Sequence, residues 1–268
     1  MRAERSWAGH ARRVTRSVDP HALYERAVQS PERDVDSLAR AFRARARREA
    51  LTLREDFAGT ALLSIAWVGS DDEREAVAID LDRACLARAA RHARARLSED
   101  ERERLRLVRA DVRTASERTF DLVVAPNFSW AIFHQPAELA SYLEGARAAL
   151  EDDGMLALEL FGGSDLRKTL VHRHRHEGFT YVWEHRSYDP AREVLEARIH
   201  FEPDEAPAIR DAFRYSFRLW SQAELEALLE GAGLGRGELL IDTPRGLRRA
   251  RREPIRPSWS GYLVARRR

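Results

Sequence analysis

Residues 51–60 read Leu51-Thr52-Leu53-Arg54-Glu55-Asp56-Phe57-Ala58-Gly59-Thr60, in which a short strand pattern runs into two carboxylates and a turn. Further short apolar runs occur at 76–80, 105–110, 120–125 and 155–161. Amphipathic helical patterns lie between these runs, at 86–97 and 136–150. Short strands that alternate with helices predict a doubly wound, mostly parallel α/β sheet with helices on both faces.

The pattern changes in the second half of the chain. Between residues 179 and 220, large apolar residues alternate with polar or smaller ones in three runs, which indicates half-buried antiparallel strands. Ser221 and Glu224 have the spacing of a helix capping box, and two last strands are predicted at 239–242 and 261–265. The expected fold is a seven-stranded sheet with an inserted antiparallel segment.

Length and composition are those of a folded protein. The chain has 268 residues, of which 44% are hydrophobic and 34% charged, and its mean hydropathy is −0.54. No apolar run reaches the ~20 residues that cross a membrane, and none follows the basic N-terminus as in a secretory signal. We therefore expect a cytoplasmic protein without a membrane partner. Cys85 is the single cysteine, which excludes an internal disulfide and a zinc site of several thiolates.

The charges nearly balance. Lys and Arg total 46 and Asp and Glu total 44, which gives a formal net charge of +2. Arginines nevertheless cluster at 43–48 and at 245–268, and such clusters supply the phosphate contacts of nucleic-acid-binding proteins. A nucleic-acid substrate is therefore kept as an alternative.

Carboxylates follow three of the predicted strands, where ligands of open parallel sheets bind. Glu55 and Asp56 end the first strand, Asp80 ends the second, and Asp111 follows the third. An ionised carboxylate only accepts hydrogen bonds, so Asp80 suits the two hydroxyls of a ribose, and Asp111 is placed for an adenine amine. Aspartates at such positions are also common helix caps, so the ordered repetition is a stronger signal than any single residue.

The missing motifs narrow the choice of cofactor. A dinucleotide-binding turn needs three glycines, and only Gly59 is present here. A phosphate-binding loop needs a Gly-Lys-Ser or Gly-Lys-Thr run, and the one lysine is the distant Lys168. A ligand with ribose and adenine but no phosphate fits this pattern, and S-adenosylmethionine is such a ligand.

At these residues the chain resembles the class I S-adenosylmethionine-dependent methyltransferases. It is similar in particular to a bacterial group whose first motif reads Leu-Arg-Glu-Asp-Phe-Cys-Gly-Thr, which matches residues 53–60 except that Ala58 replaces the cysteine. Further matching pieces lie at 22–29, 78–82, 110–113, 127–130 and 158–163. The resemblance runs from about residue 20 to the end, and it implies a Rossmann-like sheet whose last strand is antiparallel. The alanine argues against a thiol in the chemistry.

The resemblance also assigns cofactor-binding residues. The turn after the first strand would hold the methionine part, with Arg54 as a partner for its carboxylate, and the lid segment would cover it with Tyr24 and Gln29. Ribose and adenine would lie along the ends of the second and third strands, and the sulfonium would lie beside the end of the fourth. The residues so implied are Tyr24, Arg54, Glu55, Phe57, Ala58, Gly59, Thr60, Asp80, Leu81, Asp111, Val112, Asn127, Phe128 and Ser129.

We expect a single methyltransferase domain over residues 1–268, because the sequence has no internal repeat and no low-complexity linker. Its expected parts are an N-terminal helical lid, a cofactor-binding core, the inserted strands, and a C-terminal helix with a strand pair. They span residues 1–48, 51–161, 179–220 and 221–268, respectively.

No catalytic base stands out. Methyl transfer from a sulfonium depends chiefly on alignment and exclusion of water, so a base is optional. His134 and His200 are weak candidates, and the favoured interpretation of each is an ordinary surface or packing histidine. The alternating residues His172, His174 and His176 would share one face of a strand, but their neighbours are basic, so we expect solvated histidines and no metal.

The expected function is methylation of an O or N nucleophile on a small molecule. The inserted strands carry aromatic residues, such as Tyr181, Trp183 and Tyr215, which would wall a substrate pocket or form a homodimer face. One alternative is an RNA or DNA base methyltransferase, although the slot after the fourth strand, residues 125–128, lacks the Asn/Asp-Pro-Pro-aromatic run of such enzymes. The other is a binding protein that keeps the fold without catalysis.

Overall fold

The computed structural model describes residues 18–114 and 116–267, and its main sheet has eight strands in the order β11-β10-β12-β5-β4-β1-β2-β3. The parallel strands are β1 (Thr52–Asp56), β2 (Glu75–Asp80), β3 (Leu105–Arg109), β4 (Phe120–Ala125) and β5 (Leu150–Gly162). At the other end, β12 (Trp259–Arg266) pairs antiparallel with β5 and with β10 (Glu238–Ile241). The seven predicted strands and the antiparallel last strand are thus confirmed. An eighth, β11 (Arg248–Ala250), was not predicted because three residues are too few to show a pattern.

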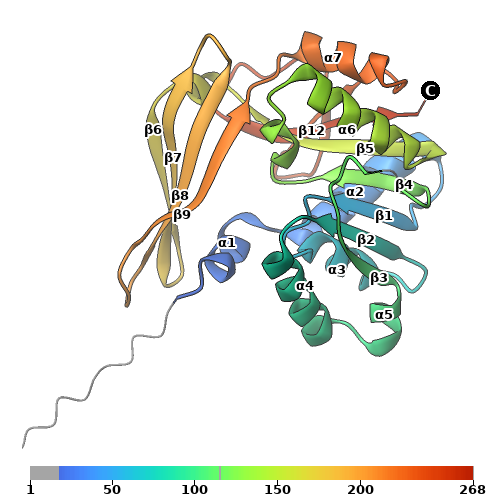
Figure 1. Ribbon diagram of the computed structural model, residues 1–268, viewed down its shortest axis with the longest axis horizontal. Helices are drawn as coiled ribbons and strands as arrows, with labels where there is room; N and C mark the ends of the chain where they lie inside the picture. The colour runs from blue at the N-terminus through green and yellow to red at the C-terminus, as the bar shows by residue number, and fades with distance from the viewer. Residues whose placement is uncertain (1–17, 115, 268) are drawn as a thin grey trace, which may run out of the picture.

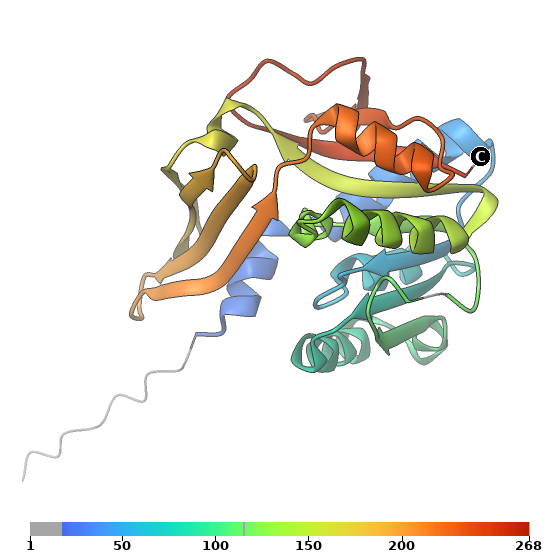
Figure 2. The same cartoon turned by 45° about the horizontal axis from the view of Figure 1, so that its top comes forward.

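Helices cover both faces of this sheet, as Figures 1 and 2 show. One face packs against α6 (Pro136–Ala148) and α7 (Gln222–Gly231). The other packs against α2 (Pro31–Ala46), α3 (Leu62–Val68) and α4 (Arg83–Arg96), and the short α5 (Glu99–Glu103) leads into β3. Alternate residues of β4 reach the two cores, because successive strand side chains point to opposite faces.

The helix ends follow local sequence signals. Asp82 caps α4 by accepting hydrogen bonds from the backbone N–H groups of Ala84 and Cys85. Ser221 and Glu224 form the predicted capping box of α7, and such caps each stabilise a helix by about 1 kcal/mol.

A second sheet of four antiparallel strands stands beside the first (Figure 1). It contains β6 (Leu170–His176), β7 (Phe179–Asp189), β8 (Val194–Pro203) and β9 (Ile209–Arg218), in that order. The last three are the predicted ones. Strand β6 was missed because histidine alternates with arginine in it, so it shows no apolar alternation.

The N-terminal segment divides into two helices with different surroundings. Helix α2 belongs to the core, since its residues Val35, Leu38 and Phe42 are at most 2% exposed. The expectation of a lid over residues 1–48 is therefore wrong for α2. Helix α1 (Pro20–Val28) lies between the second sheet and α4 (Figure 1). The rest of the expected lid, residues 1–17, lies outside the described residues. None of the helices described here is both long and apolar enough to cross a membrane.

Candidate functional site

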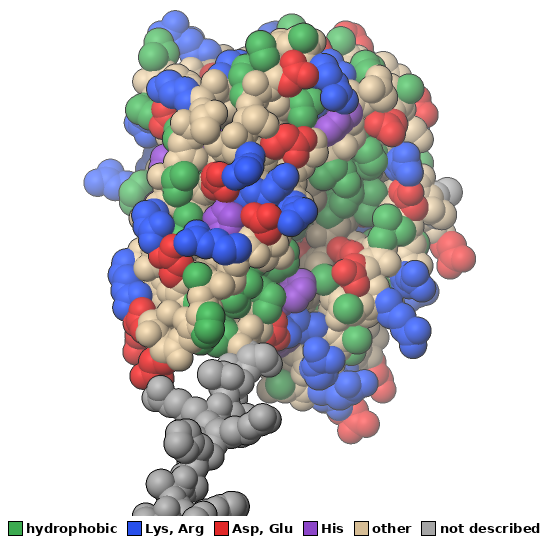
Figure 3. Space-filling model, turned by 60° about the vertical axis from the view of Figure 1, so that its left-hand side comes forward, with side chains coloured by type: hydrophobic (Ala, Val, Ile, Leu, Met, Phe, Trp, Pro, Cys, Tyr) green, Lys and Arg blue, Asp and Glu red, His purple; other side chains and the backbone are tan. Residues whose placement is uncertain are grey.

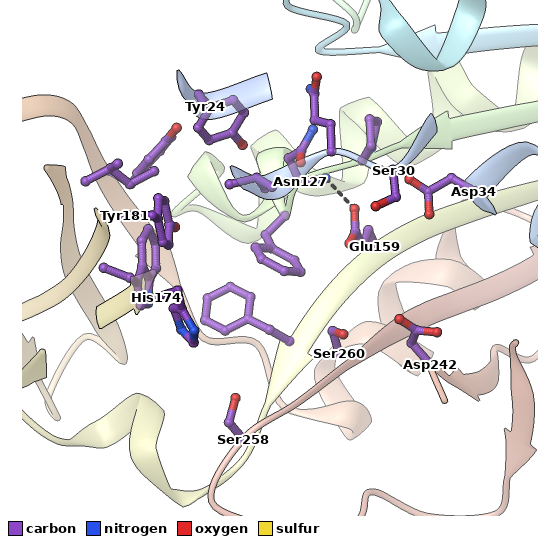
Figure 4. A pocket seen from close by; sticks show the side chains of 18 of the residues that line it. Tyr24, Ser30, Asp34, Asn127, Glu159, His174, Tyr181, Asp242, Ser258 and Ser260 are labelled. Atoms are coloured by element: carbon purple, nitrogen blue, oxygen red, sulfur yellow. Dashed lines mark hydrogen bonds between the residues drawn. The ribbon is translucent and has the colours of Figure 1, made fainter. Parts of the chain in front are cut away.

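A cavity of about 560 Å³ lies between the carboxyl ends of β1, β4 and β5 and the inner face of the second sheet. Its volume is within the range of small-ligand sites. Helix α1 and the α1–α2 turn contribute Tyr24, Gln29 and Ser30 to its wall, and Figure 4 shows Tyr24 and Tyr181 at one end and Asp34, Glu159 and Asp242 at the other.

The turn after β1 has a strained backbone. Phe57, Gly59 and Ala61 all have positive φ, at 55°, 54° and 55°. A non-glycine residue in this left-handed region costs on the order of 1 kcal/mol, and such strain concentrates at functional sites. The N–H of Ala58 donates to the carbonyl of Ile79, and hydrogen bonds of this kind hold the turn against the end of β2.

Glu55 ends β1 as a buried carboxylate in the cavity wall. Glu55 is 2% exposed. Its Oε2 accepts hydrogen bonds from the backbone N–H and the hydroxyl of Ser64, at 2.9 and 2.5 Å. Burial raises the pKa of Glu55 to about 7. The other oxygen, Oε1, accepts no hydrogen bond from a described residue, which leaves an acceptor for a cationic group.

A second strained turn follows β4. Asn127 and Phe128 have φ of 56° and 58°, and both line the cavity. The N–H of Asn127 donates to Oε2 of Glu159 at 2.6 Å, and the indole N–H of Trp130 donates to the Glu159 carbonyl at 2.6 Å. These bonds fix the turn to β5. The predicted Ser129 begins the short 3-10 helix η1 (Ser129–Ile132) and is not part of the cavity wall.

The other predicted cofactor residues lie outside the cavity wall. The turn residues Phe57, Ala58, Gly59 and Thr60 follow β1, and Asp80, Leu81, Asp111 and Val112 follow β2 and β3.

Asp80 and Leu81 are open to a ligand. Asp80 accepts from the N–H of Gly59 through Oδ2 and from the N–H of Asp82 through Oδ1, both at 2.7 Å, so each oxygen keeps acceptor capacity. Leu81 is 64% exposed, although it is apolar.

Asp111 is not free in this structure. Its carboxylate forms a forked pair with the guanidinium of Arg113, whose closest contact is 2.6 Å, and the hydrogen bonds from Arg113 lower the pKa of Asp111. Both side chains are more than a third exposed, so the pair is worth about 1 kcal/mol or less and an incoming donor would displace it at small cost.

Arg54 does not reach the cavity, which corrects its predicted role. Its side chain is completely buried; Nε donates to Asp56 at 2.7 Å and Nη2 donates to the Val112 carbonyl at 2.5 Å. Strand alternation explains the difference, because Glu55 faces the cavity while Arg54 and Asp56 share the opposite face of β1. Arg54 therefore positions the backbone of Val112 rather than binding a carboxylate of the ligand.

The two candidate bases also lie away from the cavity. His134 contacts the carbonyl of Ser216 through Nε2 at 2.9 Å and is not in the wall. Nε2 of His200 contacts Glu184 at 2.9 Å and Nδ1 accepts from the N–H of Asp211, while the neighbouring Ile199 faces the cavity. Neither histidine is placed to act on a ligand there.

The histidines in the wall are His172, His174 and His185. His185 bridges the Asp165 carbonyl and the indole N–H of Trp183, and burial lowers its pKa. The alternation of His172 and His174 correctly placed them on one strand face. His174 is exposed and His172 half-buried, in agreement with the expectation that they are solvated, and both line the cavity. In residues 18–114 and 116–267, no group of three or more His, Cys, Asp or Glu is arranged to hold a metal ion.

Three carboxylates missed by the sequence analysis gather at one end of the cavity (Figure 4). They are Asp34 from α2, Glu159 from β5 and Asp242 after β10, and Arg33 pairs with Asp242. Burial raises the pKa of Glu159 to about 7 and that of Asp34 to about 6. This end of the cavity thus holds carboxyl groups that change charge near neutral pH.

Comparison with known proteins gives matches of structure only: no family model and no curated protein sequence matches the chain. An S-adenosylmethionine-dependent methyltransferase from Clostridium acetobutylicum ATCC 824 matches with a TM-score of 0.70 and 16% identity, over 92% of this chain and 97% of that chain. CalS10, an amino pentose methyltransferase from Micromonospora echinaspora involved in calicheamicin biosynthesis, matches with a TM-score of 0.68 and 20% identity, over 92% of this chain and 96% of that chain. The sugar N-methyltransferase KedS8 from Streptoalloteichus sp. matches with a TM-score of 0.67 and 21% identity, over 100% of this chain and 98% of that chain. At these identities the likeness is one of fold, and the chain has the Rossmann-like fold of the S-adenosylmethionine-dependent methyltransferases.

Proposed function

We propose that this protein is an S-adenosylmethionine-dependent methyltransferase that acts on a small molecule. The observation that carries the proposal is the pair of strained turns after β1 and β4, in a fold shared with such enzymes. Asn127 and Phe128 of the second turn line the cavity, and so do Glu55 and Leu62, which flank the first turn. When bound, S-adenosylmethionine supplies a methyl group on a positively charged sulfur.

The residues present fit this cofactor. Asp80 has acceptor capacity for the ribose hydroxyls, and the exposed Leu81 offers an apolar face to adenine. Glu55 has a free carboxylate oxygen for the ammonium of the methionine part. Around Gly59 nothing lies within 4 Å of the place where a Cβ would stand, so the turn leaves room beside its backbone. The chain's contribution to the reaction is alignment in a site shielded from water.

Calorimetric titration with S-adenosylmethionine and S-adenosylhomocysteine tests this proposal. We expect micromolar binding of both, which corresponds to about −8 kcal/mol. If neither binds to a protein that circular dichroism shows to be folded, the reading as a binding protein without methyltransferase activity replaces it.

A small-molecule acceptor is favoured over nucleic acid. The aromatic residues Tyr181, Trp183 and Tyr215 line the cavity, and the fold neighbours CalS10 and KedS8 are described as amino pentose and sugar methyltransferases. On the side of the second sheet, basic and acidic side chains are interspersed (Figure 3), and Arg173 and Arg175 pair with acids of that sheet. Because the aromatic faces are used in the cavity, a homodimer through them stays a prediction without further support.

The C-terminal arginines test the nucleic-acid alternative. Replacing Arg248, Arg249, Arg251 and Arg252 with glutamine should leave RNA affinity at low salt unchanged if the acceptor is small. A drop in affinity together with a lower salt dependence would instead favour the alternative, because lost phosphate contacts have both effects.

Helix α1 is the part of the N-terminal segment that we propose as a lid. It carries Tyr24 over the cavity and is tied to α4 by Arg88, which contacts Asp19 and Glu25, the latter at 2.9 Å. His92 contacts the same Glu25 oxygen at 3.0 Å. Opening this lid would break these contacts.

Replacing Arg88 with methionine should therefore speed the release of S-adenosylhomocysteine by about five- to thirtyfold, because charge-assisted hydrogen bonds contribute about 1–2 kcal/mol. Displacement kinetics measure the release rate. The matched control is Arg91→Met on the same helix, because Arg91 is exposed and not part of the tie. Equal release rates in the two variants would contradict the lid.

A further inference from the structure

We propose that the methyl acceptor is an amine that enters as its ammonium ion, and that Glu159 receives the proton that the nitrogen must lose. This inference rests on the proposed function and assigns the substrate class and a proton acceptor to the same cavity.

The position of Glu159 is set by the backbone. Oε2 is held by the N–H of Asn127 at 2.6 Å, and the Glu159 carbonyl is held by Trp130. Oε1 accepts no hydrogen bond from a described residue. Figure 4 shows the side chain in the cavity beside Ser30 and Asp34, with its bond to Asn127 drawn as a dashed line. The free oxygen therefore lies in the space next to the turn that ends β4.

The charges around Glu159 leave a place for a cation. Asp34 faces it from α2 and Asp242 from the end of β10, and these two carboxylates help to raise the pKa of Glu159. Tyr262 on β12 and Tyr24 on α1 also face it, and burial keeps both as neutral phenols. Arg33 also lines the cavity, and its guanidinium pairs with Asp242.

Asp34 is compensated only through space, by the charge of Arg33, which lowers its pKa. No described residue gives its carboxylate a hydrogen bond or an ion pair at salt-bridge distance, although burial raises its pKa to about 6. Partial burial makes the charged forms of these carboxylates unfavourable, and an ammonium ion between Asp34 and Glu159 would offset that penalty. A hydroxyl acceptor carries no charge and would not.

The opposite wall also suits a cation. Tyr181, Trp183 and Tyr215 present aromatic side chains to the cavity, and Trp183 lies with its ring centroid 6.1 Å from that of Tyr215. Aromatic faces attract ammonium groups electrostatically. The cavity is therefore acidic at one end and aromatic at the other.

The proton and electron balance is simple. The ammonium gives one proton to the Glu159 carboxylate, which leaves a neutral amine with a free electron pair. That pair forms the N–C bond to the methyl carbon of S-adenosylmethionine while the C–S bond breaks and its electrons stay on sulfur. The products are a methylated ammonium ion and S-adenosylhomocysteine, and Glu159 later releases its proton to water.

The test compares an amine with the alcohol of the same shape. 2-Phenylethylamine and 2-phenylethanol are titrated into the protein saturated with S-adenosylhomocysteine, so that the cofactor site is filled. We expect the amine to bind at least about tenfold more tightly than the alcohol. In Glu159→Gln this preference should fall by about tenfold. The matched control is Asp165→Asn, because Asp165 also lines the cavity but is already paired with Lys168.

The pH dependence separates a charge effect from a structural one. The pKa of Glu159 is raised to about 7, so its carboxylate is charged above that pH and neutral below it. Amine affinity should therefore fall as the pH drops from 8 to 6 in the wild type, with an approach to tenfold per unit at the acid end. In Glu159→Gln, the remaining pH dependence of the amine affinity should occur at lower pH, near the Asp34 pKa of about 6. The affinity for the alcohol should not depend on pH in this range.

Several results would overturn the proposal. They are equal affinities for the alcohol and the amine, an unchanged preference for the amine in Glu159→Gln, and no binding of either probe at about 10 mM. If Glu159→Gln instead weakens S-adenosylhomocysteine itself as much as the amine, Glu159 holds the cofactor and not the acceptor. Failure of the proposed function is distinguishable from all of these, because the wild type would then not bind S-adenosylhomocysteine at all.

Discussion

Replacing Asp80 with asparagine is expected to weaken the binding of S-adenosylmethionine by at least about 100-fold. The carboxylate would accept hydrogen bonds from two ribose hydroxyls while it keeps its bonds to the N–H groups of Gly59 and Asp82. The asparagine amide has one acceptor oxygen in place of two. Its NH2 group would face the N–H and hydroxyl donors that the second carboxylate oxygen accepts from. A hydrogen bond to a charged group contributes about 1.5–3 kcal/mol, so the loss of two gives the stated effect.

Asp82→Asn is the control for this prediction. Asp82 lies two residues away, but its carboxylate caps α4, and asparagine caps a helix about as well as aspartate. Calorimetric titration with S-adenosylhomocysteine should give near wild-type affinity for this variant and a strong loss for Asp80→Asn. Affinities within threefold of each other would show that Asp80 does not hold the ribose.

The parallel part of the fold was predictable because its strands are short, apolar and bounded by turns. Burial on both faces keeps residues such as Val123 and Val124 apolar, and the carboxylates that follow the strands mark their ends. Strand β6 gave no such signal, since its outward arginines and its cavity-facing histidines are both polar. A single sequence cannot show that a polar face is turned toward a cavity.

The lid prediction failed at α2 for a different reason. Val35, Leu38 and Phe42 repeat at helical spacing, which is the pattern of a helix packed on a core, and the structure has it there. The resemblance implied that the whole N-terminal segment covers the ligand. Of the described residues 18–48, only Tyr24 and Val28 of α1, the α1–α2 turn and the start of α2 reach the cavity wall.

The candidate site was predictable only where one strand end carries it. Glu55 and Asn127 follow strands and reach the cavity, as expected. Asp34, Glu159 and Asp242 come from α2, the last third of β5 and the loop after β10, so their meeting depends on the packing of elements far apart in the sequence. Arg54 was assigned to the cavity face of β1, but it lies on the opposite face. Which face of a strand meets the ligand depends on the layers that pack against it, and the sequence of the strand alone does not show these layers.

Arg54 therefore yields a prediction about stability. Arg54→Met should lower the free energy of unfolding by about 3–5 kcal/mol, because it leaves the completely buried carboxylate of Asp56 without its cation. This is a large share of the ~5–15 kcal/mol that a typical domain has. The double variant Arg54→Met with Asp56→Asn should recover most of the loss. The amide oxygen of the asparagine that replaces Asp56 can still accept a hydrogen bond from the Tyr142 hydroxyl, which donates to Asp56 at 3.0 Å in the wild type.

The pH dependence of the unfolding free energy tests whether the uncompensated charge of Asp56 causes the loss of stability in Arg54→Met. Burial raises the pKa of Asp56 to about 6 even with Arg54 beside it, and removal of the guanidinium should raise that pKa further. A carboxyl whose pKa is higher in the folded protein than in the unfolded chain is destabilising where it must ionise, so stability is kept below the unfolded value of 3.8 and lost as the pH rises. Urea denaturation should therefore show a larger deficit for Arg54→Met at pH 8 than at pH 5, and no such trend for the double variant. Equal deficits at both pH values would mean that Arg54 stabilises the fold through packing and its bond to the Val112 carbonyl, and not by compensating a buried charge.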